Sequence, residues 1–305
     1  HRDEILEGLA AADLIGLHLK KYAKNLLHCA KEINAEVDLG TKRFDLGGNE
    51  TQVGAYPLGV DYDFFNGTDT GSRDQEIREK YNCENLVLGV DRQDYTKGIP
   101  ERIRAFEKFI RDNPEYRKKV ALIQRTPLSR TGIKEYQAEK SEINRDVSEF
   151  NGKYGRHDWV PINLFWGGVP QHKLIAEYRA ANVGLVTPGL DGMNLVAKEF
   201  IAANEKPKFL ILSEFAGSSV QLEEALQVNP YNTKQVSEAI KAAIEMPDEE
   251  KIERWKKLRK KVRTKDLPTW SENFLNDLDE AHHLHSMTRF TAPQSQETRP
   301  KGLGL

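Results

Sequence analysis

The residues with the richest chemistry lie at 186–200, in the order Val-Thr-Pro-Gly-Leu-Asp-Gly-Met-Asn-Leu-Val-Ala-Lys-Glu-Phe. The apolar run at 181–187 predicts a buried strand and residues 195–203 predict a helix, so the segment is a strand, a turn and a helix start. Amide N–H groups near Leu195 and Val196 have no acceptor within the helix, and the helix dipole adds positive potential there. The segment therefore predicts a phosphate site.

Two carboxylates and two glycines add to this site. Gly189 and Gly192 let the backbone turn sharply and approach a ligand closely. Asp191 lies in the turn and Glu199 one turn into the helix, where each could accept hydrogen bonds from hydroxyl groups. A polyol carrying a phosphate would satisfy both halves of the site. The structural alternative is that Asp191 caps the helix, Asn194 is a turn residue and Glu199 is solvated, because such caps are common.

A second polar loop follows the strand expected at 86–90. Its sequence, Asp-Arg-Gln-Asp-Tyr-Thr-Lys-Gly, places the cations Arg92 and Lys97 around a turn that opens the next helix. Both side chains could reach one phosphate, and a diphosphate is the simplest guest for two cations. The alternative is an ordinary turn held by ion pairs to Asp91 and Asp94.

Three further loops come after predicted strands. Arg130 follows a proline turn after 120–124 and could clamp another anionic group. The two glycines after 159–165 expose backbone groups that could contact the flat edge of a base. The loop after 209–213 opens another helix, and closing that turn explains its glycine equally well.

Helical and strand patterns alternate through this part of the chain, which is typical of a doubly wound α/β fold with a parallel sheet. We expect strands at 86–90, 120–124, 159–165, 181–187 and 209–213, with helices at 75–81, 100–111, 133–150, 171–180 and 195–203. In such sheets, ligands bind outside the carboxyl ends of the strands. The loops described above should therefore converge on one site.

The flanking segments fit the same fold class. At the N-terminal side we expect a strand at 13–18 between two helices, a hairpin or loop at 38–50 and a strand at 51–60. The Gly/Thr/Asp/Ser cluster at 66–72 predicts a linker. Helices are expected at 233–246, 248–262 and 267–283, and the composition from residue 286 onward predicts a disordered tail.

Composition narrows the function classes. The 305 residues carry a formal net charge of -2, which gives no basic field for nucleic acid or an anionic membrane. No apolar run approaches the ~18 residues of a spanning helix, and the first residues do not resemble a signal peptide. Two cysteines are too few for a disulfide framework and have no metal-ligand spacing. These features indicate a cytoplasmic protein without a membrane or nucleic-acid partner.

The motifs together resemble a known family. The combination of Gly-Val-Asp-Arg-Gln-Asp-Tyr-Thr-Lys-Gly at 89–98, Asp-Gly-Met-Asn-Leu-Val-Ala-Lys-Glu at 191–199 and Leu-Ser-Glu-Phe-Ala-Gly at 212–217 closely resembles the trehalose-6-phosphate synthase family of glycosyltransferases. The resemblance runs over about residues 5–278. It implies a retaining GT-B enzyme with two Rossmann-like domains, which moves glucose from a nucleoside-diphosphate glucose to glucose 6-phosphate to give trehalose 6-phosphate.

The resemblance also implies a role for each site residue. Arg92 and Lys97 would hold the diphosphate and, with Asp191, carry catalysis. The remaining donor contacts implied are amides of Leu195 and Val196 on the diphosphate, Glu199 on the ribose, Gly192, Met193 and Asn194 with Asp191 on the sugar hydroxyls, Val169 and Leu174 at the base, and Ala197 and Lys198 within the same motif. Arg130 would bind the acceptor phosphate. No metal or other cofactor is expected.

The resemblance implies four regions: the end of the acceptor domain at 1–70, a nucleotide-sugar-binding domain at 71–246, helices at 247–285 that pack back on the first domain, and the tail at 286–305. It also implies that the first half of the family's fold precedes residue 5 and lies outside this sequence.

The sequence leaves three functions open. Leu190 stands where the family usually has an arginine, so another phosphorylated acceptor, such as glycerol phosphate, fits as well. A non-catalytic subunit that binds a nucleotide sugar is a third reading. The donor base (UDP, GDP or ADP) and a homo-oligomeric state are not specified by these residues.

Overall fold

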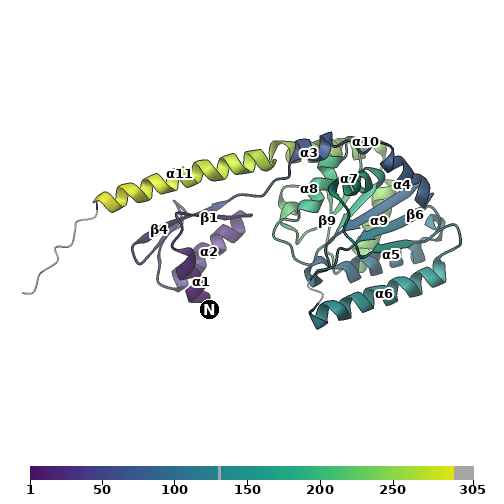
Figure 1. The fold of residues 1–305 in the computed structure, drawn as a ribbon, viewed down its shortest axis with the longest axis horizontal. Helices are drawn as coiled ribbons and strands as arrows, with labels where there is room; N and C mark the ends of the chain where they lie inside the picture. The colour runs from purple at the N-terminus through teal and green to yellow at the C-terminus, as the bar shows by residue number, and fades with distance from the viewer. Residues whose placement is uncertain (130–131, 292–305) are drawn as a thin grey trace, which may run out of the picture. The chain divides into compact units, whose positions relative to one another are not determined.

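The computed structural model describes residues 1–129 and 132–291, with side chains to residue 283 (Figure 1). It contains two compact units. The first comprises His1–Tyr56 together with the chain from Ser271 onward, and the second comprises Pro57–Trp270. The division at Tyr56 and Pro57 differs in position from the boundary near residue 70 that composition suggests.

The second unit is built on a parallel sheet, as the sequence predicts. Its described strands are, in sheet order, β10 (Leu226–Val228), β9 (Phe209–Ser213), β8 (Val183–Val186), β5 (Asn85–Val90), β6 (Val120–Arg125) and β7 (Ile162–Phe165). All pairings in this sheet are parallel. The expected strands are confirmed, and β10 is an addition that the sequence did not predict.

Helices cover both faces of this sheet (Figure 1). The described α-helices of the unit are α3 (Tyr62–Gly67), α4 (Arg73–Tyr81), α5 (Ile99–Asp112), α6 (Lys134–Tyr154), α7 (Gln171–Ala180), α8 (Leu195–Ala203), α9 (Thr233–Glu245) and α10 (Asp248–Thr264). Short 3-10 turns are η1 (Tyr95–Lys97), η2 (Pro114–Tyr116) and η3 (Gly217–Val220).

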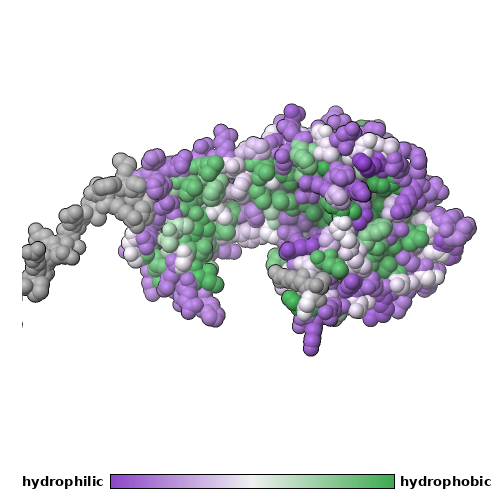
Figure 2. All heavy atoms as spheres, viewed as in Figure 1, coloured by the Kyte–Doolittle hydropathy of each residue, from purple (hydrophilic) through white to green (hydrophobic). Residues whose placement is uncertain are grey.

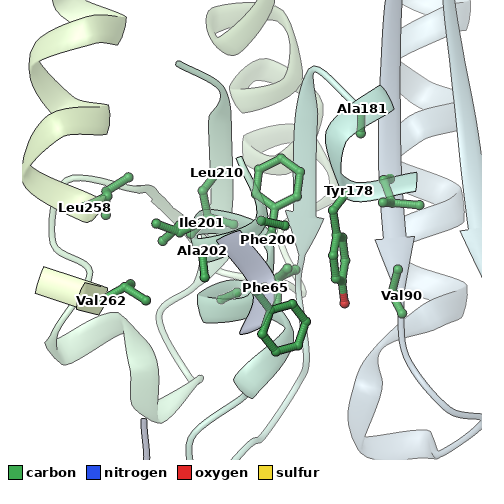
Figure 3. Close-up of a cluster of buried hydrophobic side chains, with 14 of the residues drawn as sticks. Phe65, Val90, Tyr178, Ala181, Phe200, Ile201, Ala202, Leu210, Leu258 and Val262 are labelled. Atoms are coloured by element: carbon green, nitrogen blue, oxygen red, sulfur yellow. The ribbon is translucent and has the colours of Figure 1, made fainter. Parts of the chain in front are cut away.

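Alternation along the central strand explains the two layers. Leu86 and Leu88 belong to one buried cluster, with side chains from α7, α8 and α10, while Val87 belongs to the other, with α5, α6 and α9. Successive side chains of a strand point to opposite faces, so a strand that is apolar at every position must be covered on both sides. Figure 3 shows part of the first cluster, with Tyr178 and Phe200 among its members. The visible surface of this unit is mostly hydrophilic (Figure 2).

The first unit has a four-stranded sheet in the order β1-β4-β3-β2. Its described elements are α1 (Arg2–Leu9), β1 (Leu14–Leu17), α2 (Lys20–Glu32), β2 (Glu36–Asp38), β3 (Arg43–Leu46) and β4 (Asn49–Ala55). The expected strand between two helices and the expected hairpin are both confirmed. α11 (Leu267–Thr291) extends past residue 286, where the tail was expected to begin, and residues 292–305 lie outside the described residues.

The segment at 66–72 has four exposed residues out of seven, but it is attached to the second unit at two positions, unlike a free linker. Thr70 is 3% exposed. The Arg179 guanidinium donates hydrogen bonds to the carbonyl oxygen of Asn66 at 2.9 Å and to Thr70 Oγ1 at 3.1 Å. Composition correctly indicated a largely irregular segment, but one distant arginine holds Asn66 and Thr70 within the second unit.

Candidate active site

The loops after β5 and β8 meet, as the parallel sheet predicts. The amides of Gly189 and Leu190 both donate to the carbonyl oxygen of Thr96, at 2.8 and 3.2 Å. Gly98 has a φ of 61°, and a Cβ atom there would lie 2.8 Å from the carbonyl oxygen of Thr187. A side chain at position 98 would therefore be strained and would push the two loops apart.

The loop after β9 also contacts the 187–194 turn. The Gly217 amide donates to the carbonyl oxygen of Asp191 at 2.9 Å, and the Asp191 amide donates to the carbonyl oxygen of Phe215 at 3.3 Å. A Cβ atom at Gly217 would lie 2.0 Å from the carbonyl oxygen of Gly192. This glycine does more than close its own turn, because it lets the backbone of one loop hold Asp191 in place.

The central ionic contact joins the two polar loops. Lys97 Nζ lies 2.5 Å from Asp191 Oδ2, with the two side chains 17% and 14% exposed. Asn194 Nδ2 donates to the same carboxylate oxygen at 3.0 Å. The pair is shielded from bulk water, which makes its electrostatic interaction stronger than that of a surface ion pair.

Arg92 is placed differently from Lys97. Its guanidinium forms an ion pair with Asp94 at 3.3 Å, and the Arg92 side chain is 59% exposed. Asp94 in turn accepts hydrogen bonds from the amide and hydroxyl of Thr96. The ion-paired turn that the sequence offered as an alternative is therefore present at Arg92, while Lys97 pairs across to Asp191.

The helix cap at the site is Asn194, not Asp191. Asn194 adopts a φ of 68°, and its side-chain oxygen accepts a hydrogen bond from the Ala197 amide at 3.1 Å. The amides of Leu195 and Val196 open α8, in the first turn where helical N–H groups have no intrahelical acceptor. This leaves both amides pointing out of the helix start, where the sequence predicts an anion.

Glu199 lies on the first turns of α8 and is half-buried. Tyr178, which is 1% exposed, donates its hydroxyl hydrogen to Glu199 Oε2 at 2.7 Å. Burial raises the pKa of the Glu199 carboxyl, and the hydrogen bond from Tyr178 opposes that rise. The solvated alternative for Glu199 is wrong, since one carboxylate oxygen is held by a core tyrosine.

Other residues of the motif are mainly buried. Met193 is 3% and Ala197 0% exposed. The Lys198 side chain is 2% exposed, and its ammonium donates to the carbonyl oxygen of Leu58 at 2.6 Å. Burial and then Lys265 lower the pKa of Lys198 to about 8.

The residues predicted to contact the base lie on the connection from β7 to β8. Val169 follows β7 and is partly buried, and Leu174, on α7, packs against the cluster that contains Tyr178. Arg130 lies outside the described residues, so its assignment to an acceptor phosphate stays a prediction.

A buried arginine to which the sequence analysis gave no role connects the strands that carry these loops. Arg102, 1% exposed, binds Asp91 at 2.6 Å, Thr187 Oγ1 at 3.1 Å and Gln124 Oε1 at 3.2 Å. One side chain thus joins three neighbouring strands near their carboxyl ends. The signal was available, because Arg102 occupies an apolar-face position of its helix, three residues after Ile99.

The part of the chain that the structure describes has neither a candidate metal centre nor a candidate membrane span. No group of three His, Cys, Asp or Glu side chains in that part of the chain is placed to hold a metal ion. None of the described helices combines the length and apolar character needed to cross a membrane.

Comparison with known proteins places the chain in a family. The model of "Glycosyltransferase family 20" matches residues 1–280. The 56 kDa subunit of the UDP-forming alpha,alpha-trehalose-phosphate synthase of Saccharomyces cerevisiae is 38% identical over 282 residues, which cover 91% of this chain and 57% of that protein. The trehalose-6-phosphate synthase of Sinorhizobium fredii is 37% identical, over 90% of this chain and 61% of its own length.

Solved structures give the same result. A trehalose-6-phosphate synthase structure from E. coli, bound with UDP-2-fluoro glucose, matches with a TM-score of 0.85 and 31% identity, over 90% of this chain and 62% of that one. A UDP-forming synthase from Burkholderia xenovorans, in complex with glucose-6-phosphate, matches with a TM-score of 0.86 and 32% identity, over 90% of this chain and 62% of that one. The chain thus spans about three fifths of the proteins it matches. It belongs to glycosyltransferase family 20 and has the GT-B fold of that family.

Proposed function

We propose that this chain carries the donor side of a retaining glucosyltransferase that moves glucose from a nucleoside-diphosphate glucose to glucose 6-phosphate, giving α,α-trehalose 6-phosphate. The observation that supports it best is the shielded Lys97–Asp191 pair beside the open amides of Leu195 and Val196. A cation and two amides suit a diphosphate, and a carboxylate suits sugar hydroxyls.

The names of the relatives support the two substrates. The E. coli structure holds a UDP-glucose analogue, and the B. xenovorans structure holds glucose 6-phosphate. Glu199, oriented by Tyr178, is suited to accept a hydrogen bond from a ribose hydroxyl, and the loop that contains Val169 is suited to contact the base.

The chemistry follows from positioning. Lys97, Arg92 and the α8 amides would stabilise the diphosphate as its bond to the anomeric carbon breaks, while the acceptor hydroxyl forms the new bond on the same face and passes its proton to the departing diphosphate. Asp191 would hold sugar hydroxyls and would not attack the sugar, unlike the nucleophilic carboxylate of a retaining glycosidase. Asp191 holds Lys97 at 2.5 Å, so a carboxylate of the protein itself orients the cation.

The remaining assignments belong to the same proposal. Catalysis would need no metal ion, the protein would be cytoplasmic with a nucleotide sugar and a sugar phosphate as its partners, and a homo-oligomer is compatible with it. Arg130 would bind the acceptor phosphate. Arg130→Ala should raise the Michaelis constant for glucose 6-phosphate about ten- to hundred-fold while leaving nucleotide affinity nearly unchanged. Loss of nucleotide binding in that variant would instead place Arg130 at the diphosphate.

A different acceptor is the second candidate, favoured by one observation. Leu190, where the family usually has an arginine, is 65% exposed. An exposed leucine offers no charge to an acceptor phosphate.

One assay separates these candidates and the non-catalytic reading. The protein that contains this chain is incubated with UDP-glucose, GDP-glucose or ADP-glucose and with glucose 6-phosphate or glycerol phosphate, and the glucosylated acceptor phosphate and the released nucleotide are measured. We expect transfer to glucose 6-phosphate. Transfer only to glycerol phosphate would support the second candidate, and tight nucleotide binding without transfer would support a regulatory subunit.

A further inference from the structure

A cavity of about 570 Å³ lies in the second unit, away from the loops described above. It is lined by the last residues of α7 and α8, by α4 and by the residues that lead into β9. The helices α4, α7 and α8 end shortly before the amino ends of β5, β8 and β9, in that order. The donor loops instead follow the carboxyl ends of β5 and β8. The cavity and the donor loops are therefore at opposite ends of the same sheet.

Cations dominate the charged lining. The lining side chains with a formal charge are the cations Arg78, Arg179, Lys206 and Lys208 and the carboxylates Asp74 and Glu205. Among the described residues, no carboxylate oxygen lies within 4.0 Å of a side-chain nitrogen of any of these four cations. This excess of positive charge is local, because the chain as a whole has a formal net charge of -2.

Two of these cations share one neutral acceptor. Lys208 Nζ donates to the carbonyl oxygen of Arg179 at 3.0 Å, and Arg78 Nη2 donates to the same oxygen at 3.4 Å. A carbonyl dipole at a helix end attracts cations, but it cancels neither charge. Lys208 and Arg78 each keep further N–H donors, which the carbonyl does not use.

Arg179 itself has a structural role. Its guanidinium donates to the carbonyl oxygens of Ala203 and Asn66, both at 2.9 Å, and to Thr70 Oγ1 at 3.1 Å. Its donors hold the backbone around the cavity, so the donors available to a ligand come from Arg78, Lys206 and Lys208.

The pKa of Lys208 is lowered by its burial beside other cations. Burial, followed by the charges of Arg78 on α4 and Lys206 on the same loop, lowers the pKa of Lys208 to about 7. Asp74 on α4 opposes this shift, and Lys251 on α10 adds to it. A bound anion would stabilise the charged ammonium, because an opposite charge nearby favours the ionised form.

We propose that this cavity is a second anion site, which binds a phosphorylated small molecule through its phosphate group by contacts to Arg78, Lys206 and Lys208. Arg and Lys donors are the groups that bind phosphate in proteins. The volume falls within the range of about 300–1,000 Å³ for small-molecule pockets, which leaves room for more than the phosphate itself. The site is independent of the proposed transferase activity.

Titration calorimetry with inorganic phosphate tests the site in a background that lacks the cations assigned to the donor and to the acceptor phosphate, with Arg92→Gln, Lys97→Gln and Arg130→Gln combined. We expect phosphate to bind in that background. Adding Lys208→Gln or Arg78→Gln should weaken binding about ten- to hundred-fold, as for loss of one charge-assisted contact. Lys206→Gln, at an exposed position, is the variant least able to affect folding and should also weaken binding. Lys256→Gln, an exposed lysine on α10, is the matched control and should leave binding unchanged.

A second readout uses sulfate, a dianion that does not titrate near neutral pH. Binding of sulfate at pH 8 should take up protons onto Lys208, so the measured heat should depend on the ionisation enthalpy of the buffer, and this dependence should vanish in Lys208→Gln. The proposal is overturned if phosphate fails to bind at about 10 mM, or if it binds equally well in the Lys206, Lys208 and Arg78 variants.

Discussion

Lys97 is the residue on which the proposed chemistry depends most. It lies on the loop after β5, yet its ammonium is held by Asp191 on the loop after β8, 2.5 Å away. A cation fixed before the substrate arrives needs no reorganisation when charge develops on the leaving group. Arg92, exposed and paired within its own turn, has more freedom and is expected to contribute less.

We predict that Lys97→Ala lowers kcat by about 10²- to 10³-fold, the usual effect of removing one preorganised electrostatic group. The Michaelis constant for the donor should change much less, because the charge it stabilises is largest in the transition state. Steady-state kinetics with UDP-glucose and glucose 6-phosphate checks this, with Lys119→Ala, an exposed lysine, as the control. An unchanged kcat would return Lys97 to a purely structural ion pair.

The buried Lys198 gives a prediction for stability. Its pKa is lowered from 10.5 to about 8, so between these values the unfolded chain binds more protons than the folded chain. The free energy of unfolding should therefore rise with pH from about 8 to 10.5, by an amount on the order of 3 kcal/mol from this residue.

Urea unfolding of the wild type and of Lys198→Met, compared at pH 7.5, 9 and 10, isolates this effect. The methionine keeps the apolar stem and removes the titrating group, while Lys208 titrates in both proteins and cancels in the difference. As the pH rises, the free energy of unfolding of the wild type should increase relative to that of Lys198→Met. A gap that does not vary with pH would show that Lys198 is solvated when charged.

At the scale of elements, the sequence predicted the strands of the second unit well, but it gave no order for them in the sheet. Apolar runs bounded by turn residues are strong local signals, so β5, β6, β8 and β9 were expected at nearly their observed positions. β10 was missed because three residues, Leu226–Val228, are too few to show a pattern.

Long-range contacts account for the other differences. Lys97 and Asp191 are 94 residues apart, and they meet because β8 pairs with β5 in the sheet. Arg179 and Thr70 are 109 residues apart, and their contact attaches a loop that looks like a linker to the second unit. Composition shows which residues are available, but strand order decides which of them touch.

Gly217 links two elements through its lack of a side chain. Because a Cβ atom there would lie 2.0 Å from the carbonyl oxygen of Gly192, Gly217→Ala must displace one of two backbones. We predict that Gly217→Ala lowers kcat on the order of 10²-fold while the protein stays folded. The displaced turn carries Asp191, and a misplacement of about 1 Å can cost that much in rate.

Gly152→Ala is the matched control for Gly217→Ala. Position 152 lies within α6, and a Cβ atom added there would meet no other atom within 4 Å. This change should stabilise the protein by about 0.5–1 kcal/mol and leave kcat unchanged. Equal kinetic effects of the two substitutions would mean that the Gly217 contact does not hold the donor turn.

At the scale of the whole molecule, donor and acceptor functions are expected to be unequally represented in these 305 residues. The chain spans 57% of the yeast relative, and residues 1–280, which the family model matches, contain all of the donor-side residues named above. Among the site residues named above, only Arg130 is assigned to the acceptor.

We therefore predict that the 305-residue chain, produced alone, binds a nucleoside diphosphate at submillimolar concentration but transfers glucose slowly. Calorimetric titration with UDP, GDP and ADP measures the first property, and release of nucleotide from UDP-glucose in the presence of glucose 6-phosphate measures the second. Lys97→Ala should weaken diphosphate binding by about tenfold or more, as expected for loss of one charge-assisted contact. Lys119→Ala should leave it unchanged.

If none of the three nucleotides binds at millimolar concentration, the donor site built from Lys97, Asp191 and the α8 amides is wrong. Fast turnover by the isolated chain would instead show that these residues hold the acceptor as well.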